Sequence, residues 1–582
     1  MAKRTPPAVL RNYERWSVLT DPGSLDMIRM HNASSRFGYR PKISILLPVY
    51  DPEPAWLVRA LDSVMAQTYP NWELCICDDC STKGHVSETL DLYERIDERV
   101  KVRRLEKNEN IVGATNHALS LAAGEFVGLL DHDDELAPHA LFEVVRFLQE
   151  HRDADSIYSD EDKIDESGAR TNPHFKTGWS HDLAMEANYL NHFSVYRRAL
   201  LEELGGWREG FDGAQDLELV QRVGEKTDKV HHIPRVLYHW RMVTGSTAVG
   251  AEGKPYTHEK ARRAIQESLE RQGIAGTAED SALMPNTFRV RREVLGQPRV
   301  SVIVLTSKSD PEKLLASLRA DTTYENHEVL VLDTKKGTLT GDGEAKKLEG
   351  TEPTELYNAA VRTSEGEYVV LLDPDLEAVS GEWLESMLQH AQREEVGAVG
   401  SKLTLPSGEV YSAGLIPSAG YGEGRPRFHR NCDRSTMGYD LYFALNRNCS
   451  AVSSRCVMLR KDAFEEVGGF DEIHFDGAFA DVDLCLRMRE RGRLIVFTPY
   501  ANFVHHGSPE GPAGLNPDEA EYVRGRWGNV LGKDPYHNPN LLWDPEDLSM
   551  IRGNPFSQPP KDKGASGDES SAPTGTQGTL PP

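Results

Sequence analysis

Five aspartates early in the chain come just after short apolar segments, and together they could bind a divalent cation. They are Asp51, Asp78, Asp79, Asp131 and Asp133. If each apolar segment is a buried parallel strand, these side chains gather at the carboxyl ends of the strands, where open α/β sheets bind their ligands. Clustered carboxylates repel one another, and a hard cation with oxygen ligands relieves that repulsion. A single aspartate is more often a helix cap or a turn residue, but Asp-His-Asp-Asp at 131–134, behind an apolar strand, favours a metal site.

The elements that must position these aspartates alternate along the chain. Apolar segments at 43–47, 73–77, 100–105 and 126–130 are typical of strands, and the segments at 56–67, 86–96 and 113–123 are typical of helices. Strands that alternate with helices indicate an α/β, Rossmann-like fold with a mostly parallel sheet and helices on both faces.

The same order of elements returns in the second half of the chain, with strand-like segments at 300–304, 328–332 and 368–372. The frame N-x7-G-E-x5-D occurs first as Asn116, Gly124 and Asp131, and again as Asn358, Gly366 and Asp373. Asp216 in AQDLEL matches Asp481 in ADVDLC, and a histidine follows each, His239 after 23 residues and His505 after 24. Agreement of these landmarks in order predicts an internal duplication of one domain.

These landmarks divide the chain into two domains with connecting segments. We expect a first domain at 41–250 and a second of the same fold at 298–510. The remainder is expected to be an N-terminal extension at 1–40, a helical linker at 251–297, a C-terminal helical extension at 511–555 and a tail at 556–582. The tail has almost no apolar residues, and this composition predicts disorder.

The composition excludes some classes of partner. The chain has 91 acidic and 66 basic residues, a formal net charge of −25, whereas nucleic-acid binding needs a basic surface. Its seven cysteines do not make a disulfide framework, and Cys75, Cys77 and Cys80 lack a fourth ligand at zinc spacing. We find no apolar signal segment and no stretch of the ~20 apolar residues that a membrane helix needs. We therefore expect a cytoplasmic protein, with peripheral contact at the inner face of the cell membrane left open.

Several motifs resemble bacterial members of glycosyltransferase family 2, which have the GT-A fold. In the first block they are PVYD (48–51), CDDCS (77–81), LLDHDDELAP (129–138), GAQDLEL (213–219) and GSTA (245–248), and in the second block LLDPD (371–375) and DVDLCLR (481–487). The chain resembles in particular the tandem two-domain type that builds surface polysaccharides and O-antigens. The order and spacing of the motifs make this resemblance specific.

The resemblance implies roles for the nucleotide-sugar side of the first domain. Asp79 would face the nucleotide base, and Pro48, Tyr50 and Asp51 would line the same pocket. Asp131 would lie near the ribose.

The resemblance also implies the residues of the chemical step. Asp133 would hold Mn²⁺ or Mg²⁺ on the diphosphate, where the cation neutralises the charge of the leaving group as a Lewis acid. Asp216 would be the general base that accepts the proton of the acceptor hydroxyl. His239 would add a metal or diphosphate contact. The alternatives are a helix N-cap for Asp216 and a partly buried histidine for His239.

The second domain keeps part of this set. Asp373 would bind the nucleotide sugar, Asp375 and His505 the metal, and Asp481 would be the base. It departs from the pattern at the nucleotide side and in the motif itself, with Leu305 for Pro48, Thr334 for Asp79 and Leu376 for Asp134. We therefore expect the first domain to have the more complete site.

The leading hypothesis is a metal-dependent, inverting glycosyltransferase that moves a sugar from a nucleotide-diphosphate sugar to a growing surface glycan or lipid-linked glycan. It could act with both domains, or with one active domain and a second that binds the acceptor. A non-catalytic glycan-binding protein on the same fold is an alternative of another class. A nucleotidyltransferase is disfavoured because PVYD has no Lys or Arg to hold a triphosphate.

Overall fold

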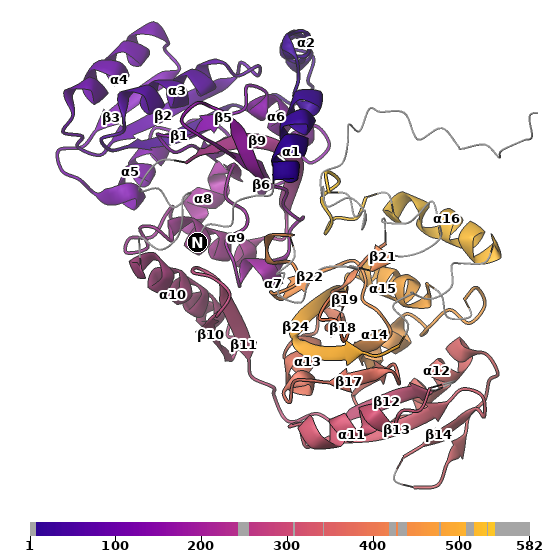
Figure 1. Ribbon diagram of the computed structural model, residues 1–582. Coiled ribbons are helices and arrows are strands. Elements are labelled where there is room, and N and C mark those ends of the chain that lie inside the picture. Colours follow the sequence, from indigo (N-terminus) through magenta and orange to yellow (C-terminus); the bar gives the residue numbers. More distant parts are fainter. Residues whose placement is uncertain are drawn as a thin grey trace, which may run out of the picture.

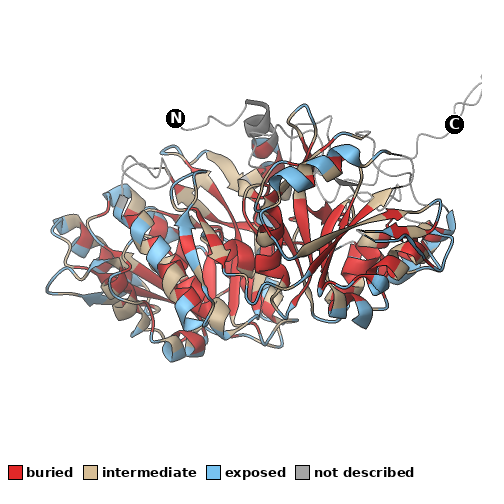
Figure 2. Cartoon of the chain, turned by 90° about the horizontal axis from the view of Figure 1, so that it is seen from below, coloured by how far each residue is buried: buried red, intermediate tan, exposed pale blue. Residues whose placement is uncertain are grey.

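The computed structural model describes residues 7–242, 255–306, 309–341, 343–417, 427–428, 439–475, 479–507, 517–531 and 533–541 of the 582-residue chain. Two α/β domains lie side by side, the first in indigo to magenta and the second mostly in orange (Figure 1). Buried residues concentrate in the strands of both domains, and exposed residues lie mainly on the outer helices (Figure 2). The expected pair of tandem α/β domains is confirmed.

The sheet of domain 1 has the strand order β3-β2-β1-β4-β8-β6-β9-β5, with β7 beside β6. Its strands are β1 Ile43–Val49, β2 Trp72–Asp78, β3 Val100–Arg104, β4 Phe126–Leu129, β5 Glu135–Leu136, β6 Ser156–Ile164, β7 Arg170–His174, β8 Ser194–Arg197 and β9 Val230–Arg241. The first four pair in parallel, as the sequence predicts. Strand β8 then runs antiparallel to both β4 and β6, so the second half of the sheet is mixed.

Helices cover both faces of this sheet because the side chains of β1 alternate between two apolar clusters. Leu46 belongs to the cluster that includes Ala118 of α5, whereas Ile45 and Leu47 belong to the cluster that includes Leu61 of α3. The helices of domain 1 are α3 Pro54–Met65, α4 Gly84–Ile96, α5 Asn110–Leu119, α6 Ala140–Leu148, α7 His181–Ala184, α8 Arg198–Leu204 and α9 Gln215–Lys226.

Domain 2 repeats this topology. Its strand order is β15-β14-β13-β12-β16-β23-β18-β24-β17, with β19 beside β18 and β22 beside β24. Its strands are β12 Val300–Thr306, β13 His327–Asp333, β14 Thr338–Thr340, β15 Lys346–Lys347, β16 Tyr368–Leu372, β17 Leu376–Ala378, β18 Val396–Thr404, β19 Val410–Ser412, β22 Arg447–Asn448, β23 Cys456–Arg460 and β24 Leu494–His505. Its helices are α11 Glu312–Asp321, α12 Pro353–Thr363, α13 Trp383–Ala391, α14 Lys461–Glu466 and α15 Ala480–Glu490. From β13 to β17 the path matches the path from β2 to β5 strand for strand.

The two copies also share side-chain contacts that the frame N-x7-G-E-x5-D encodes. Asn116 exchanges two hydrogen bonds with the backbone of Trp207, its Nδ2 donating over 2.8 Å and its Oδ1 accepting over 2.9 Å. Asn358 makes the same pair with Phe470, at 2.9 and 2.8 Å. In each copy a glycine with positive φ precedes the bonded residue, and a Cβ there would lie 2.4 Å from the asparagine oxygen.

One part of domain 2 is built differently. After β13 the chain forms the antiparallel pair β14 and β15, where domain 1 has helix α4 and the parallel strand β3. In domain 1 this unit follows Asp79 directly. The nucleotide side expected from the sequence therefore differs in backbone as well as in residue type.

The connecting segments pack onto the domains. Helices α1 Pro7–Thr20 and α2 Ser24–Ser34 form much of the N-terminal extension, and α16 Pro517–Leu531 lies in the C-terminal one. The linker contains the expected helix, α10 Pro255–Arg271, and also a hairpin of β10 Gly276–Asp280 and β11 Phe288–Arg292 that the sequence did not reveal. The GSTA motif and the tail at 556–582 lie outside the described residues. None of the described helices combines the length and apolar character needed to cross a membrane.

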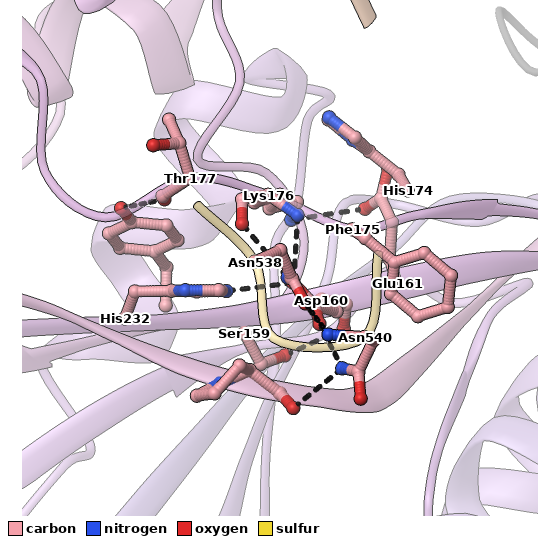
Figure 3. Close-up of polar contacts among 12 residues, drawn as sticks. Ser159, Asp160, Glu161, His174, Phe175, Lys176, Thr177, His232, Asn538 and Asn540 are labelled. Atoms are coloured by element: carbon pink, nitrogen blue, oxygen red, sulfur yellow. Dashed lines mark hydrogen bonds and ion pairs between the residues drawn. The ribbon is translucent and has the colours of Figure 1, made fainter. Parts of the chain in front are cut away.

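Residues 533–541 return from domain 2 to domain 1. Asn538 donates from Nδ2 to both carboxylate oxygens of Asp160, at 2.9 and 3.0 Å, and to the carbonyl oxygen of Lys176 at 2.9 Å (Figure 3). The Asp534 carboxylate accepts a hydrogen bond from Ser450 of domain 2. This segment therefore joins the two domains through buried polar contacts.

A buried aspartate also joins the domains. The Asp182 carboxylate accepts hydrogen bonds from Arg393 at 2.5 Å and Asn448 at 2.8 Å, and lies 3.6 Å from Arg292. Burial alone would raise the pKa of Asp182, but the charges of Arg393 and Arg292 hold it well below its usual range. The carboxylate is thus ionised and compensated inside the interface.

Replacing Asp182 by Asn should destabilise the protein by about 3–5 kcal/mol, because two buried guanidinium groups lose their counter-charge. Urea unfolding followed by circular dichroism measures the change. The matched control is Asp26→Asn, which removes an exposed pair with Arg29 and should cost less than about 1 kcal/mol. Equal stability of the two variants would contradict the prediction.

Candidate functional site

A pocket in domain 1 opens where β1 and β4 end and α9 begins. Its lining includes Pro48, Asp131, Asp216 and Tyr238. Asp131 follows β4 after one further residue, and Asp216 is the second residue of α9. The structure therefore brings together two aspartates that are 85 positions apart in the sequence (216 minus 131).

Asp216 has the properties of a proton acceptor near neutral pH. Burial raises its pKa, the charge of Asp131 raises it further, and the charge of His192 opposes both, so that the value is about 6. Gln215 donates a hydrogen bond to its Oδ2 at 3.0 Å. A carboxylate with this pKa is mostly ionised at pH 7 and can accept a proton.

The four residues at 131–134 divide into two groups. Asp134 is buried and structural: it accepts hydrogen bonds from the Tyr238 hydroxyl at 2.6 Å and the Arg241 backbone N–H at 2.7 Å. Burial and the neighbouring carboxylates raise its pKa well above the usual range. Asp133 is partly exposed, and burial followed by the charge of Asp131 raises its pKa against the opposing charge of His132. Asp131 and Asp133 are thus the members left for a ligand.

His239 lies away from this pocket. Its Nδ1 is 2.6 Å from Oδ1 of Asp162, which also accepts a hydrogen bond from the Tyr13 hydroxyl of α1 at 2.6 Å. The side chain therefore joins β9 to β6 and to the N-terminal helix. Its expected contact with a metal or a diphosphate does not appear in this geometry, which matches the alternative of a partly buried histidine.

The alignment of His239 with His505 is wrong by one residue. Glu135 and Glu377 are equivalent, because each lies four residues after the first aspartate of its motif. Glu135 pairs with His239, whereas Glu377 pairs with Val504. His505 is the next residue, so its counterpart in domain 1 is Trp240. A shift of one residue in a strand turns a side chain to the opposite face of the sheet.

The residues assigned to the nucleotide side differ in exposure and in the hydrogen bonds that they already make. The Asp51 carboxylate accepts hydrogen bonds from Thr82 and from the backbone N–H of Lys83, which lower its pKa. Tyr50 is 46% exposed, beside His132. Asp79 is buried and accepts a hydrogen bond from the Glu109 N–H at 2.6 Å. Burial raises the pKa of Asp79.

These contacts leave the roles assigned at the nucleotide side as predictions. Asp51 follows β1, and its carboxylate bonds to Thr82 and Lys83, which lead into α4. Pro48 lines the pocket, and Asp79 lies at the end of β2, on the same edge of the sheet.

The corresponding edge of domain 2 holds a candidate metal centre. Asp373, Asp375 and His505 each offer one ligand atom, and these atoms lie within 4.8 Å of one another, the one such group among the described residues. The Nδ1 atom of His505 is buried without a hydrogen-bond partner, and the ring stacks on Tyr411 at 4.4 Å. Gly507 leaves room there, since a Cβ would lie 2.6 Å from the Asp375 carboxylate. Carboxylates suit Mg²⁺ and Mn²⁺, whereas an imidazole also suits Zn²⁺. The three side chains therefore fit a divalent cation without selecting one of these ions.

Asp481 occupies the position of Asp216 but is more heavily bonded. Its Oδ2 accepts hydrogen bonds from the backbone N–H and the hydroxyl of Ser454, at 3.0 and 3.3 Å, and its Oδ1 from the Val482 N–H at 2.8 Å. Burial raises its pKa while these bonds lower it. The expected base of domain 2 is therefore already hydrogen-bonded to Ser454 and Val482.

Two cations beside the motifs were missed from the sequence. His192 Nε2 lies 3.9 Å from Asp131, and Arg455 makes an ion pair with Asp373. Gly128 and Val370 are equivalent, because each lies three residues before the first aspartate of its motif. Gly128 pairs with Val195 and Val370 with Met458. His192 and Arg455 each lie three residues before that partner, so they occupy equivalent positions. The two residue types differ and no motif surrounds them, so only the strand pairing reveals that they correspond.

Comparison with known proteins places both domains among glycosyltransferases. The model of "Glycosyl transferase family 2" matches residues 44–205, and that of "Glycosyltransferase like family 2" matches 288–529. An uncharacterized protein of Sinorhizobium fredii is 38% identical over 546 residues, which cover 90% of this chain and 60% of that protein. The O-antigen biosynthesis protein RfbC of Myxococcus xanthus is 35% identical over 567 residues, covering 94% of this chain and 44% of that protein.

The chain thus spans about half the length of these two curated relatives. Among solved structures, that of Staphylococcus aureus TarS (residues 1–349) with UDP aligns with 39% of this chain and 65% of that one. The sequence identity is 21% and the TM-score 0.32.

His505→Ala should weaken Mn²⁺ binding by about tenfold or more, because even residues behind the ligands change metal affinity by 10–100-fold. His239→Ala is the matched control and should leave the affinity unchanged, since its side chain pairs with Asp162. Titration with Mn²⁺ followed by electron paramagnetic resonance measures free metal. Equal loss in both variants would contradict the placement of the metal centre.

Proposed function

The chain carries two tandem domains of glycosyltransferase family 2, and on this basis we propose that it is a metal-dependent glycosyltransferase of surface-polysaccharide synthesis. It would move a sugar from a nucleotide-diphosphate sugar to a hydroxyl of a glycan or lipid-linked glycan, with inversion. The observation that carries the proposal is the convergence of Asp131 and Asp216 in one pocket at the carboxyl ends of the strands. The relative named for O-antigen biosynthesis supports the choice of acceptor, although this chain spans only 44% of it.

In domain 1 the chemical step needs a base for the acceptor hydroxyl and a positive charge that neutralises the leaving diphosphate. Asp216 accepts the proton of the acceptor hydroxyl as its oxygen bonds to the anomeric carbon. The bond from that carbon to the diphosphate oxygen breaks, and the nucleoside diphosphate leaves with the electron pair. A base on the side opposite to the leaving group produces inversion, as in inverting glycosidases.

A divalent cation, when bound, neutralises the charge that develops on the diphosphate. In domain 2 it would be held by Asp373, Asp375 and His505. In domain 1 the proposal assigns it to Asp133, beside Asp131, on the resemblance to the family.

A second candidate gives the domains unequal roles. Domain 2 has the β14–β15 hairpin where domain 1 has α4 and β3, and its base position is hydrogen-bonded to Ser454. These features favour one active domain, with the second binding the acceptor or another sugar nucleotide.

Separate Asp133→Ala and Asp375→Ala substitutions distinguish the candidates. If both domains transfer, each change should remove one of two transfers by about 100-fold or more, because each disrupts charge stabilisation of the leaving group. If only domain 1 transfers, Asp375→Ala should leave activity intact. Release of nucleoside diphosphate from a panel of nucleotide sugars with Mn²⁺ or Mg²⁺ measures this. Full activity in both variants would overturn the enzymatic proposal.

Activity of domain 1 should fall as the pH drops below about 6. The pKa of Asp216 is raised to about 6, so the carboxylate that accepts the proton is lost below that value. The kcat/KM for transfer between about pH 5 and pH 8 measures the effect. Asp216→Asn should lower kcat by about 10²–10⁴-fold and abolish this dependence. An unchanged pH profile in Asp216→Asn would refute its role as the base.

A further inference from the structure

We propose that His192 is the cation of domain 1 that contacts the diphosphate of the bound donor, held in position by the buried carboxylate of Glu161. This inference rests on the proposed function and adds a residue that the family motifs do not include. It is carried by three observations: the position of His192 in the pocket, its contact with Glu161, and its counterpart in domain 2.

The first observation is where His192 lies. It lines the same pocket as Asp131 and Asp216, with its side chain 20% exposed. The ring stacks on Tyr238 at 4.7 Å, with an angle of 18° between the planes, so its direction is fixed. Its Nε2 lies 3.9 Å from the Asp131 carboxylate, too far for a hydrogen bond. This N–H is therefore available to a ligand in the pocket.

The second observation is how Glu161 holds the other ring nitrogen. Glu161 Oε2 lies 3.0 Å from Nδ1 of His192 and also accepts a hydrogen bond from the His192 backbone N–H. Lys176 Nζ, which is fully buried, lies 3.6 Å from the same oxygen (Figure 3). Burial alone would lower the pKa of His192, but the bond and charge of Glu161 raise it to about 9. Glu161 thus fixes the ring with Nδ1 toward the buried carboxylate and Nε2 on the side of Asp131.

The third observation is the counterpart in domain 2. Arg455 stands at the register position of His192, pairs with Asp373 and lies 3.2 Å from His505 Nε2. Both domains thus place a cation beside the first aspartate of the motif. The residue type differs, but the charge and its place in the fold are kept.

Besides the divalent cation assigned to Asp133, a protein cation at this place counters the repulsion between the pocket carboxylates and a diphosphate. Asp131 and Asp216 line the pocket on the side where the leaving group must lie, and their carboxylates repel its phosphates. A protonated imidazole donates a charge-assisted hydrogen bond to a phosphate oxygen and stabilises charge that grows as the donor bond breaks. The same group would therefore strengthen both binding of the product and transfer.

The test compares binding of nucleoside diphosphates with that of the bare nucleosides. UDP, GDP, CDP and dTDP are titrated calorimetrically into the full chain carrying Asp375→Ala, which removes a predicted metal ligand of domain 2. The tightest diphosphate and its nucleoside are then titrated into His192→Ala, His192→Arg and His151→Ala. His151 stacks on Phe147 outside the pocket and is the matched control.

His192→Ala should weaken diphosphate binding by about tenfold or more and leave nucleoside binding unchanged. His192→Arg, which copies Arg455, should retain most of the affinity, and His151→Ala all of it. Equal diphosphate affinity in His192→Ala, or a parallel loss for the nucleoside, would overturn the inference alone. Failure of the parent chain to bind any of the four diphosphates would overturn the proposed function with it.

Glu161→Gln separates a positioning role from a structural one. In the parent chain it should weaken diphosphate binding about as much as His192→Ala, whereas in the His192→Arg background it should have little effect, because arginine needs no carboxylate to stay charged. An equal loss in both backgrounds would show that Glu161 acts on the fold and not through His192. If Glu161→Gln does not fold, as judged by thermal unfolding, the His192 variants decide the question.

Discussion

Three consecutive buried carboxylates in β6 must each find a partner, and the rest of domain 1 is arranged around that requirement. An unpaired charge at such a depth would cost several kcal/mol. Asp160 is paired with His232 and with Asn538 of the C-terminal segment. Glu161 is paired with His192 in the pocket, and Asp162 with His239. One strand thus ties the candidate site to segments from both ends of the described chain.

This arrangement joins the outer segments to the strand behind the pocket. The hydroxyl of Tyr13 in α1 bonds to Asp162, and the ring packs against Phe175 and Trp16 in one apolar cluster with Leu541. The N-terminal helix and residues 533–541 therefore meet on the same side of β6. Removing either would expose carboxylates whose neighbours include the pocket residue His192.

Features that depend on local pattern could be predicted from the sequence, whereas features that depend on strand register could not. The strand that ends at Asp78, the strand before Asp131 and the repeated frame around Asn116 appear in the sequence as apolar runs or repeats, so they could be predicted. The offset between His239 and His505 was hidden, since spacings of 23 and 24 residues look equivalent until the pairing with Glu135 and Leu376 is known. His192 and Arg455 were hidden because their correspondence exists only in the pairing of neighbouring strands. The β14–β15 hairpin stands where domain 1 has α4 and β3, in a segment with no clear helical period.

The two domains have kept the same scaffold and diverged at opposite ends of the site. Both keep the paired backbone hydrogen bonds of Asn116 or Asn358. Both also have an ion pair inside the helix that carries the candidate base, Glu218–Arg222 in α9 and Asp483–Arg487 in α15. Domain 1 has α4 and β3 beside the residues predicted for the nucleotide side, and Trp240 where domain 2 has His505, a predicted metal ligand. Domain 2 brings Asp373, Asp375 and His505 together and has the β14–β15 hairpin in place of the α4–β3 unit. Because the scaffold contacts are shared while the positions at the two candidate sites differ, we expect the two sites to take different ligands.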